Sequence, residues 1–412
     1  MEEKKKIKIL VHYDDNSGVS RFRSIWPHQY IQEHYGDEFD IDMMMLSDFP
    51  KENLAEFLKQ YDIFVYHKHL DRNKKILEMA KFIGLPCVID IDDNLKLGPD
   101  HPLFLSSQKE GWGELIAYHL RNSDWVTTTT EIFAKELKKY NKNICVLPNA
   151  IDPEMEQFKQ TKKPSDRIRL GLVCGSTHMK DIELMQGISK LPKDVLDKIQ
   201  ICLCGFDTRG QITIYDKQTG QSTRRPIKPE ESVWARYEEF LTNNYATVSD
   251  EHKNFLKLFM QTEDPFTNEP YRRFWTKNIN EYAKHYENVD VLLAPLKEND
   301  FNKVKSELKE IECAFTDTAI MASWFGPYTL NLVPYLEKGG TVNPNGNAFV
   351  VDPSKNHKQW VKYITYIANH PECVDILKKN LKRDIYDKYS METVTKDRVE
   401  LYRKIYQEHN NK

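Results

Sequence analysis

The chain has 412 residues, of which 59 are Lys or Arg and 62 are Asp or Glu, so its net charge is −3. This length predicts two or three domains, and the near balance of charge excludes nucleic-acid binding by a bulk positive field. The sequence has neither the roughly 18 consecutive apolar residues of a spanning helix nor a signal-peptide core. We therefore expect a cytoplasmic protein, either free or peripheral on the inner face of the membrane.

Short apolar runs alternate with helix-like spacing through the first half of the chain. The expected strands are 7–12, 61–66, 87–91, 125–129 and 144–148. Helix-like spacing lies between them at 23–35, 52–60, 72–83 and 131–140. This alternation predicts a parallel sheet with helices on both faces. We assign a first doubly wound domain to residues 1–155.

The pattern restarts after a polar linker at 155–167. The expected strands are 169–174, 199–205, 289–296, 319–323 and 348–352. We assign a second domain to 165–385, with an insertion at 207–275 that begins with a hairpin around Gly220 and continues with helices. Residues 386–412 are expected to form a helix that packs back on the first domain. The predicted fold is α/β, with two doubly wound, Rossmann-like domains facing across a cleft.

Loops that follow strands are the candidate sites, because ligands bind outside the carboxyl ends of strands in such sheets. The first loop holds Gly18, which permits close backbone approach to a ligand. It also holds Arg21 and Arg23, which could meet a phosphate or an acceptor anion. The alternative is a turn with two solvated arginines. The loop has no GxGxxG motif, which disfavours a dehydrogenase.

Acidic residues end the strand that starts at Cys87. Asp90 and Asp92 share one face of that strand, and Asp93 and Asn94 begin the loop. Such a group could bind Mg²⁺, bind acceptor hydroxyls or supply a base. Because burying several like charges is unfavourable, we expect a functional role.

The second domain carries two candidate phosphate-binding segments. The loop 175–181 has small residues and a lysine at a strand-to-helix turn, which suits a diphosphate; its candidates are Gly175, Ser176, His178 and Lys180. The alternative for His178 is an ordinary surface histidine. In the segment 300–312, Ser306 could cap a helix whose start favours negative charge.

Lys305 and Lys309 flank Ser306, and Glu312 could accept hydrogen bonds from sugar hydroxyls. A phosphate-binding part beside a hydroxyl-binding part predicts an enzyme that uses a nucleotide sugar. The motifs GxSxG, HExxH, SxxK with partners and GxxxxGK[ST] do not occur, which disfavours the corresponding hydrolases and ATPases. In the insertion, Arg272 and Arg273 have the alternative of a salt-bridged helix face.

The residues Leu293–Leu296, Phe301, Asn302, Lys305, Ser306, Lys309 and Glu312 together resemble a pattern of retaining GT-B glycosyltransferases of the large family 4 group. The chain looks most like bacterial members that assemble surface polysaccharides, and its loops 90–94 and 175–181 look like their companion loops. The resemblance implies donor binding by Gly18, Gly175, Ser176, His178, Lys180, Asn302, Lys305, Ser306, Lys309 and Glu312. It implies catalytic roles for Asp92, Asp93 and Lys305, and an acceptor side at Arg21 and Arg23.

The group binds its donor through a Glu-x7-Glu motif, whose second residue corresponds here to Glu312 and whose first corresponds to Val304. Asn302, Lys303 or Lys305 could take the place of the first Glu. The resemblance implies transfer of a hexosyl or related group, with retention and without metal or cofactor. The expected partners are a nucleotide diphosphate sugar and a glycan, lipid-linked or other acceptor, with no nucleic acid. The alternatives are a sugar-nucleotide epimerase and a non-catalytic scaffold of a polysaccharide-synthesis complex.

Overall fold

The chain forms two compact units in the computed structural model, which describes residues 5–68, 71–94, 96–99, 101, 103–207, 210–215, 222–228, 231–242, 270–337, 339–355 and 357–411. Unit 1 comprises 1–153, 298–311 and 385–412, and unit 2 comprises 154–297 and 312–384. The segment 298–311, which the sequence pattern assigns to the second domain, is part of unit 1 by its contacts.

A parallel sheet of six strands runs through the described part of unit 1, in the order β2-β1-β3-β4-β5-β6. Its strands are β1 (Ile7–His12), β2 (Phe39–Met44), β3 (Ile63–His67), β4 (Cys87–Ile91), β5 (Trp125–Thr128) and β6 (Ile144–Val146). The order reverses between β1 and β3, so the loops that follow these two strands begin at the switch point where doubly wound sheets bind ligands.

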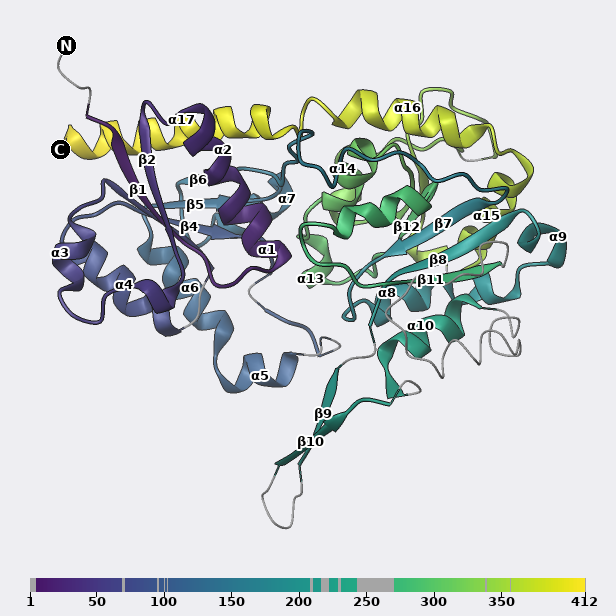
Figure 1. Cartoon of the computed structure of the whole chain (residues 1–412), viewed down its shortest axis with the longest axis horizontal. Coiled ribbons are helices and arrows are strands. Elements are labelled where there is room, and N and C mark those ends of the chain that lie inside the picture. Colours follow the sequence, from purple (N-terminus) through teal and green to yellow (C-terminus); the bar gives the residue numbers. More distant parts are fainter. Residues whose placement is uncertain are drawn as a thin grey trace. The chain divides into compact units, whose positions relative to one another are not determined.

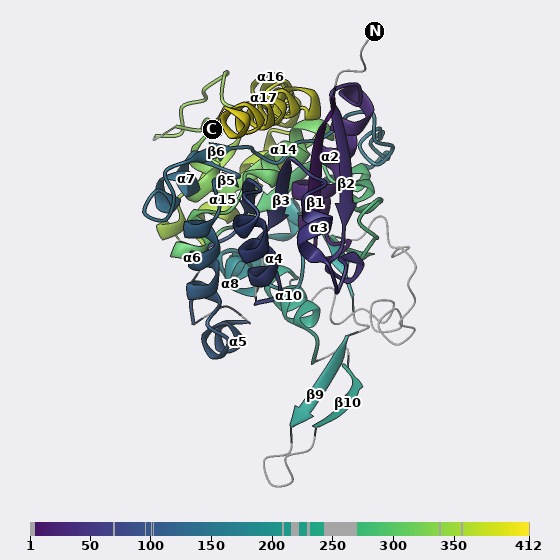
Figure 2. The same ribbon diagram turned by 90° about the vertical axis from the view of Figure 1, so that its left-hand side faces the viewer.

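Helices cover both faces of the unit 1 sheet (Figures 1 and 2). One face packs against α2 (Trp26–His34) and the last helix, α17 (Met391–Asn410), whose Tyr402 and Ile405 share a buried cluster with Ile9 and Val11. The other face packs against α3 (Leu54–Leu58), α4 (Asp71–Phe82), α6 (Trp112–Asn122) and α7 (Glu131–Leu137). Three short helices, α1 (Gly18–Ser20), α5 (Phe104–Lys109) and α13 (Asp300–Lys303), lie in the segments that follow β1, β4 and β12.

A second parallel sheet of six strands forms the described part of unit 2, in the order β11-β8-β7-β12-β13-β14. Its strands are β7 (Ile168–Val173), β8 (Ile199–Phe206), β11 (Tyr271–Trp275), β12 (Val291–Ala294), β13 (Ala319–Ser323) and β14 (Phe349–Val351). The order reverses between β7 and β12, which is the switch point of this sheet. The two sheets confirm the predicted α/β class with two doubly wound, Rossmann-like domains.

The helices of unit 2 are short around the switch point and longer toward the end of the chain. They include α8 (Met179–Ile182), α9 (Lys193–Leu196), α10 (Val233–Leu241), α14 (Leu308–Phe315), α15 (His357–Asn369) and α16 (Cys373–Ile385), of which α14 begins within the unit 1 segment 298–311. None of the helices in the described part of the chain is both long and apolar enough to cross a membrane.

The insertion contains one element that the sequence pattern misassigns. Arg272 and Arg273 belong to β11, which pairs in parallel with β8, so the helix-face alternative is wrong. Arg273 is buried, and its Nε donates a 2.5 Å hydrogen bond to Glu238 of α10. This ion pair lets a charged sequence occupy a largely buried edge strand of the sheet. The expected hairpin forms from β9 (Gln211–Tyr215) and β10 (Ser222–Pro226), while Gly220 and residues 243–269 lie outside the described residues.

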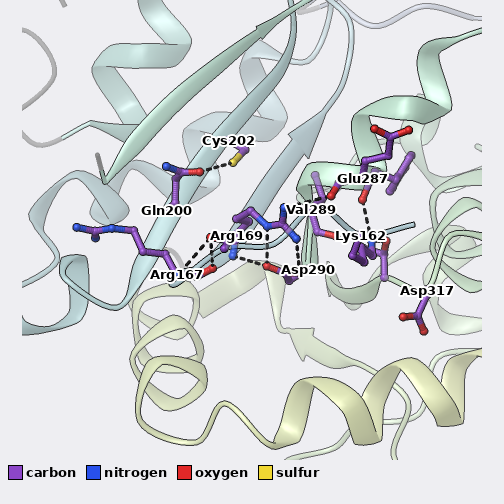
Figure 3. Close-up of polar contacts among 12 residues, drawn as sticks. Lys162, Arg167, Arg169, Gln200, Cys202, Glu287, Val289, Asp290 and Asp317 are labelled. Atoms are coloured by element: carbon purple, nitrogen blue, oxygen red, sulfur yellow. Dashed lines mark hydrogen bonds and ion pairs between the residues drawn. The ribbon is translucent and has the colours of Figure 1, made fainter. Parts of the chain in front are cut away.

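An ion pair and several hydrogen bonds connect the chain near the amino ends of β7 and β12, the two strands that flank the switch point of unit 2 (Figure 3). Arg169 donates two hydrogen bonds of 2.9 Å to the two carboxylate oxygens of Asp290. Nearby, the Lys162 ammonium donates to the carbonyl oxygens of Tyr286 and Val289 and to the Thr318 hydroxyl. Burial lowers the pKa of Lys162 to about 7. These side chains fix the strands from which the candidate loops leave.

Candidate functional site

A cluster of basic and acidic side chains lies at the carboxyl ends of β3 and β4 in unit 1. The Lys68 ammonium is 2.6 Å from the Asp92 carboxylate and 3.1 Å from the Asp93 carboxylate. His67, the last residue of β3, contacts Asp92 through Nε2 at 3.1 Å. The structure thus brings the predicted catalytic residues Asp92 and Asp93 together with two residues that the sequence pattern did not indicate. A histidine and a lysine at a strand end give no local signal, because their pairing depends on the neighbouring strand.

The ion pairs between Lys68, His67 and the two aspartates outweigh burial in setting the protonation states of Asp92 and Lys68. Burial alone would raise the pKa of Asp92, but the charges of Lys68 and His67 outweigh burial and hold that pKa well below its ordinary value. Burial would lower the pKa of Lys68, but Asp92 and Asp93 raise it instead. The ion pair is therefore charged at neutral pH. Within the described ranges, no three His, Cys, Asp or Glu side chains are arranged to hold a metal ion.

Arg23 and Asp90 form a buried ion pair under this edge of the sheet. Arg23 donates through Nε and Nη2 to the two Asp90 oxygens, at 2.9 and 2.7 Å. Asp90 also accepts a 2.6 Å hydrogen bond from the Thr127 hydroxyl. Arg23 Nη1 donates to the Leu147 carbonyl and to Asn149 Oδ1, at 2.7 and 3.2 Å. Arg23 is buried, so the alternative of a solvated arginine is wrong for this residue.

Asn149 carries this network to Ser306. The Asn149 amide nitrogen donates a 3.0 Å hydrogen bond to the Ser306 hydroxyl oxygen. Ser306 accepts this bond and keeps its own O–H as a donor. The chain Asp90–Arg23–Asn149–Ser306 therefore holds the predicted donor-binding serine in one orientation, two residues before α14. We call these four residues the Arg23 network.

Glu307 is a buried carboxyl group beside the Arg23 network. It is 2% exposed, and its Oε2 has no hydrogen-bond partner among the described residues. Burial raises the pKa of Glu307 to about 7, although its own backbone N–H, Tyr389, Lys388 and Arg23 act in the opposite direction. The sequence pattern does not indicate this residue, because the glutamate lies in a charged stretch that is typical of a solvent-exposed segment. Its interactions with Arg23 and Tyr389 join residues that are far apart in the sequence.

The rest of the segment 298–311 packs on unit 1 through specific contacts. Asn94 donates a 2.8 Å hydrogen bond to the Asp300 carbonyl. Lys305 lies over the Phe301 ring, 5.2 Å from its centroid, and is half-buried. Asn302 is buried beside them, and Lys309 is half-buried on the first turn of α14. Val304, which stands where the related motif has its first Glu, is buried in an apolar cluster of unit 1.

The loop after β1 is more open than the Arg23 network. Gly18 begins α1 and is half-buried. Arg21 is also half-buried, and its Nη2 donates to Asn16 at 3.1 Å. The two arginines lie on the helical segment Arg21–Ile25 that follows α1, and they differ in role: Arg23 is engaged by protein groups, whereas the Arg21 side chain reaches the surface.

In unit 2, the loops after β7 and β12 meet at the switch point. Gly175 and Ser176 are exposed, with open space around Gly175. The Tyr237 hydroxyl donates to the Gly175 carbonyl at 3.1 Å and accepts from the His178 backbone N–H at 2.9 Å, which sets the loop geometry. His178 contacts Asp181 through Nδ1 at 2.9 Å.

Two further contacts fix the ends of this loop. Asp181 accepts a 2.8 Å hydrogen bond from the Lys297 backbone N–H and so links the β7 loop to the β12 loop. Lys180 is exposed and paired with Glu183 at 3.0 Å. The structure therefore brings Gly175, Ser176 and His178 together at the switch point and leaves the Lys180 side chain toward solvent.

Glu312 lies inside unit 2, on α14. It is 1% exposed, and its two oxygens accept hydrogen bonds from the hydroxyls of Tyr282 and Tyr286, at 2.8 and 2.6 Å. A carboxylate has about four acceptor positions, of which these two tyrosines occupy two. The two tyrosines hold the carboxylate in place, as a hydroxyl-binding group requires. The ligand contacts of these residues stay predictions.

The comparisons with known proteins identify the fold of the chain. No protein-family model matches the sequence, and no curated protein matches it. A solved glycosyltransferase from Rickettsia africae ESF-5 is similar with a TM-score of 0.59 and 12% identity, over 98% of this chain and 99% of that chain. An α,α-trehalose-phosphate synthase from Burkholderia vietnamiensis has a TM-score of 0.60 and 11% identity, over 98% of both chains.

HepE from Anabaena in complex with UDP has a TM-score of 0.59 and 10% identity, over 96% of this chain and 99% of that chain. At such identities the likeness speaks for architecture alone, and it extends over nearly the whole chain in each case. The chain has the GT-B fold of two Rossmann-like domains, as the sequence predicted.

Proposed function

We propose that the protein is a glycosyltransferase that moves a sugar from a nucleotide diphosphate sugar to a glycan, lipid-linked or other acceptor. The observation that carries this proposal is the fold, which is shared with solved glycosyltransferases over 98% of the chain. HepE, one of these proteins, was solved with UDP, with UDP and glucose, and with UDP-glucose. A uridine diphosphate sugar is therefore the first donor to test.

Unit 2 supplies the groups we assign to the nucleoside part of the donor. The exposed loop at Gly175 and Ser176 leaves the switch point, where such sheets bind ligands. The Glu312 carboxylate, oriented by Tyr282 and Tyr286, suits ribose hydroxyls. We assign Lys305 and the oriented Ser306 hydroxyl to phosphate oxygens, and Asp92 and Asp93 to acceptor hydroxyls.

Electrostatic stabilisation of the leaving diphosphate is the main catalytic effect in this proposal. Preorganised donors are effective because they need no reorganisation when negative charge develops. The Arg23 network supports this role, because it orients the Ser306 hydroxyl before any ligand arrives. Retention of configuration, independence from metal, membership of the family 4 group and a cytoplasmic or membrane-peripheral location belong to the same proposal.

Calorimetry with UDP, GDP, CDP and ADP, followed by product analysis with the matching sugar nucleotides, tests the proposal. We expect one nucleoside diphosphate to bind and its sugar nucleotide to be consumed only when an acceptor is present. Sugar conversion without an acceptor would instead establish an epimerase. If none of the four nucleotides binds, the enzyme assignment fails.

Paired variants locate the site in the same assay. Glu312→Gln should weaken binding of the nucleoside diphosphate about 10-fold or more, because a ribose hydroxyl loses a charged acceptor. Lys305→Ala should weaken it through loss of a cation near the phosphates. Lys303→Ala is the matched control, since Lys303 is paired with Glu136 at 2.8 Å and lies two residues away. Equal losses in the two lysine variants would remove Lys305 from the site.

One observation favours a non-catalytic scaffold as the second candidate. Val304 stands at the first Glu position of the related motif and is buried in the unit 1 core, so it cannot provide a polar contact to a sugar. A scaffold would bind no sugar nucleotide in the calorimetric panel. Retained nucleotide affinity without turnover would indicate a chain that keeps the donor site and has lost the reaction.

A further inference from the structure

A pocket lies at the amino ends of β4 and β5, at the opposite edge of the unit 1 sheet from Asp92 and Asp93. Its volume is about 350 Å³, and its walls come from the end of α4, the starts of both strands and the last turns of α17. The apolar part of the lining consists of Leu85, Pro86, Trp125 and Ile405. Gly84, at the pocket, has no atom within 4 Å of the position that a Cβ would take, so the pocket is open there.

Phe82 stands beside this pocket, two residues before Gly84. It is 85% exposed, the largest exposed fraction of any large apolar side chain in the described part of the chain. It is the last residue of α4, and the turn after it is held by a 2.8 Å hydrogen bond from the Leu85 N–H to the Ala80 carbonyl. The end of α4 therefore presents an aromatic ring to solvent next to a pocket whose walls are apolar in part.

We propose that this face is a contact between two copies of the chain, in which Phe82 of each copy enters the pocket of the other. A two-fold dimer uses the same patch on both copies and needs a patch that is complementary to itself. A protruding ring adjacent to a pocket satisfies that condition. An apolar cavity of about 150 Å³ accommodates benzene, so the volume of about 350 Å³ is sufficient for a phenyl ring.

The charges around the pocket fit the same arrangement. Lys81, the neighbour of Phe82, is exposed, and its ammonium donates a 2.8 Å hydrogen bond to the Asn122 carbonyl. The exposed carboxylates of Asp124 and Glu408 line the pocket together with Lys81 and His409, and Glu408 is 3.9 Å from Lys404 of its own copy. Insertion of Phe82 brings Lys81 of each copy to Asp124 and Glu408 of the other copy. Each half of the two-fold contact then pairs one ammonium with two carboxylates, which favours this partner over others.

Sedimentation velocity of the full chain tests the proposal. We expect wild type to show a reversible monomer–dimer equilibrium as concentration rises, and Phe82→Ser to remain monomeric. Leu105→Ser is the matched control, because Leu105 is 79% exposed on α5 and does not line the pocket. It should dimerise as wild type does. A monomeric wild type at every concentration, or equal behaviour of the two serine variants, overturns the proposal.

A charge-swap experiment separates ring-in-pocket contact from general hydrophobic association. Glu408→Arg keeps Phe82 but places a positive charge where Lys81 of the other copy would lie, so this variant alone should dimerise weakly. The double variant Lys81→Glu with Glu408→Arg restores opposite charges at both half-contacts and should dimerise more strongly than Glu408→Arg alone. A double variant that dimerises no better than Glu408→Arg contradicts the proposal. Nucleotide binding is an independent readout and should be unchanged in Phe82→Ser.

Discussion

Glu307 shows how one buried carboxyl group can make the whole chain sensitive to pH. Burial raises its pKa to about 7, against an ordinary value of 4.5. Between these two values the unfolded chain releases the proton while the folded chain keeps it. The folded state therefore binds more protons in this window, and its stability falls as pH rises from about 4.5 to 7.

Glu307→Gln should remove this dependence, because the amide does not ionise. As pH rises through that window, we expect the free energy of unfolding of wild type to fall by about 3 kcal/mol more than that of the variant. Urea unfolding at a series of pH values measures the effect. Glu298→Gln, an exposed carboxylate in the same segment, is the control and should follow wild type. If Glu307→Gln follows wild type as well, Glu307 is ionised in the folded chain.

Arg23 and Arg21 provide a second comparison at the residue scale. Arg23→Met leaves Asp90 as a buried charge that keeps the hydrogen bond from the Thr127 hydroxyl but loses both bonds from the guanidinium. Breaking one partner of a buried pair is destabilising by about 3–5 kcal/mol. Arg21→Met removes a half-exposed side chain and should change stability by less than about 1 kcal/mol. Chemical denaturation measures both, and equal losses would show that the Arg23–Asp90 pair contributes nothing specific.

The candidate site residues differ in how far the sequence could reveal them. Asp92 and Asp93 were indicated because acidic residues directly follow an apolar run. Glu312 was indicated by a motif. His67 and Glu307 were not, since each acquires its environment from residues on other strands or segments. The burial of Arg23 has the same cause, because Asp90 and Asn149 are distant in the sequence.

At the scale of elements, apolar runs located most strands of both sheets. The exceptions, β2 and β11, have sequences that hide their burial. In β2, Asp40 and Asp42 alternate with apolar residues on an edge strand, and one face of that strand reaches solvent. In β11, Arg273 is neutralised by Glu238 of α10, a partner that no local pattern specifies.

Gly171 in β7 gives a test of packing at this scale. A Cβ at this position would overlap both methyl groups of Val289, next to the clamp between Arg169 and Asp290. Gly171→Ala should therefore destabilise unit 2 by about 1–3 kcal/mol through overpacking. Gly175→Ala, where a Cβ meets open space, should stay within about 0.5 kcal/mol of wild type. Thermal unfolding of the two variants checks this, and a neutral Gly171→Ala would mean that Val289 moves away freely.

At the scale of the whole molecule, the two units are assembled from discontinuous pieces of chain. Unit 1 takes its sheet from 1–153, but it also takes in 298–311 and 385–412. Val304 fills one of its apolar clusters, and Tyr402 and Ile405 fill another. The break between the predicted domains near residue 155 is therefore not a place where the chain can be cut without loss to unit 1.

A fragment of residues 1–153 should consequently fail to reach a packed state. We expect it to bind a hydrophobic dye and to lack near-ultraviolet circular dichroism, because both faces of its sheet have lost apolar partners. A fusion of 1–153 with 385–412 through a flexible linker should recover near-ultraviolet signal, since it restores α17. A cooperatively folded 1–153 fragment would show that α17 contributes little to this unit.

The same discontinuity has a consequence for biosynthesis. The ribosome releases the strands of unit 1 first, yet Tyr402 and Ile405 leave it only after all of unit 2. During the whole synthesis of unit 2, one face of the nascent amino-terminal sheet lacks α17. Such a domain exposes apolar surface for longer than a domain that is contiguous in sequence. We expect the nascent chain to be held by chaperones until α17 has been synthesised, and its yield to depend on them.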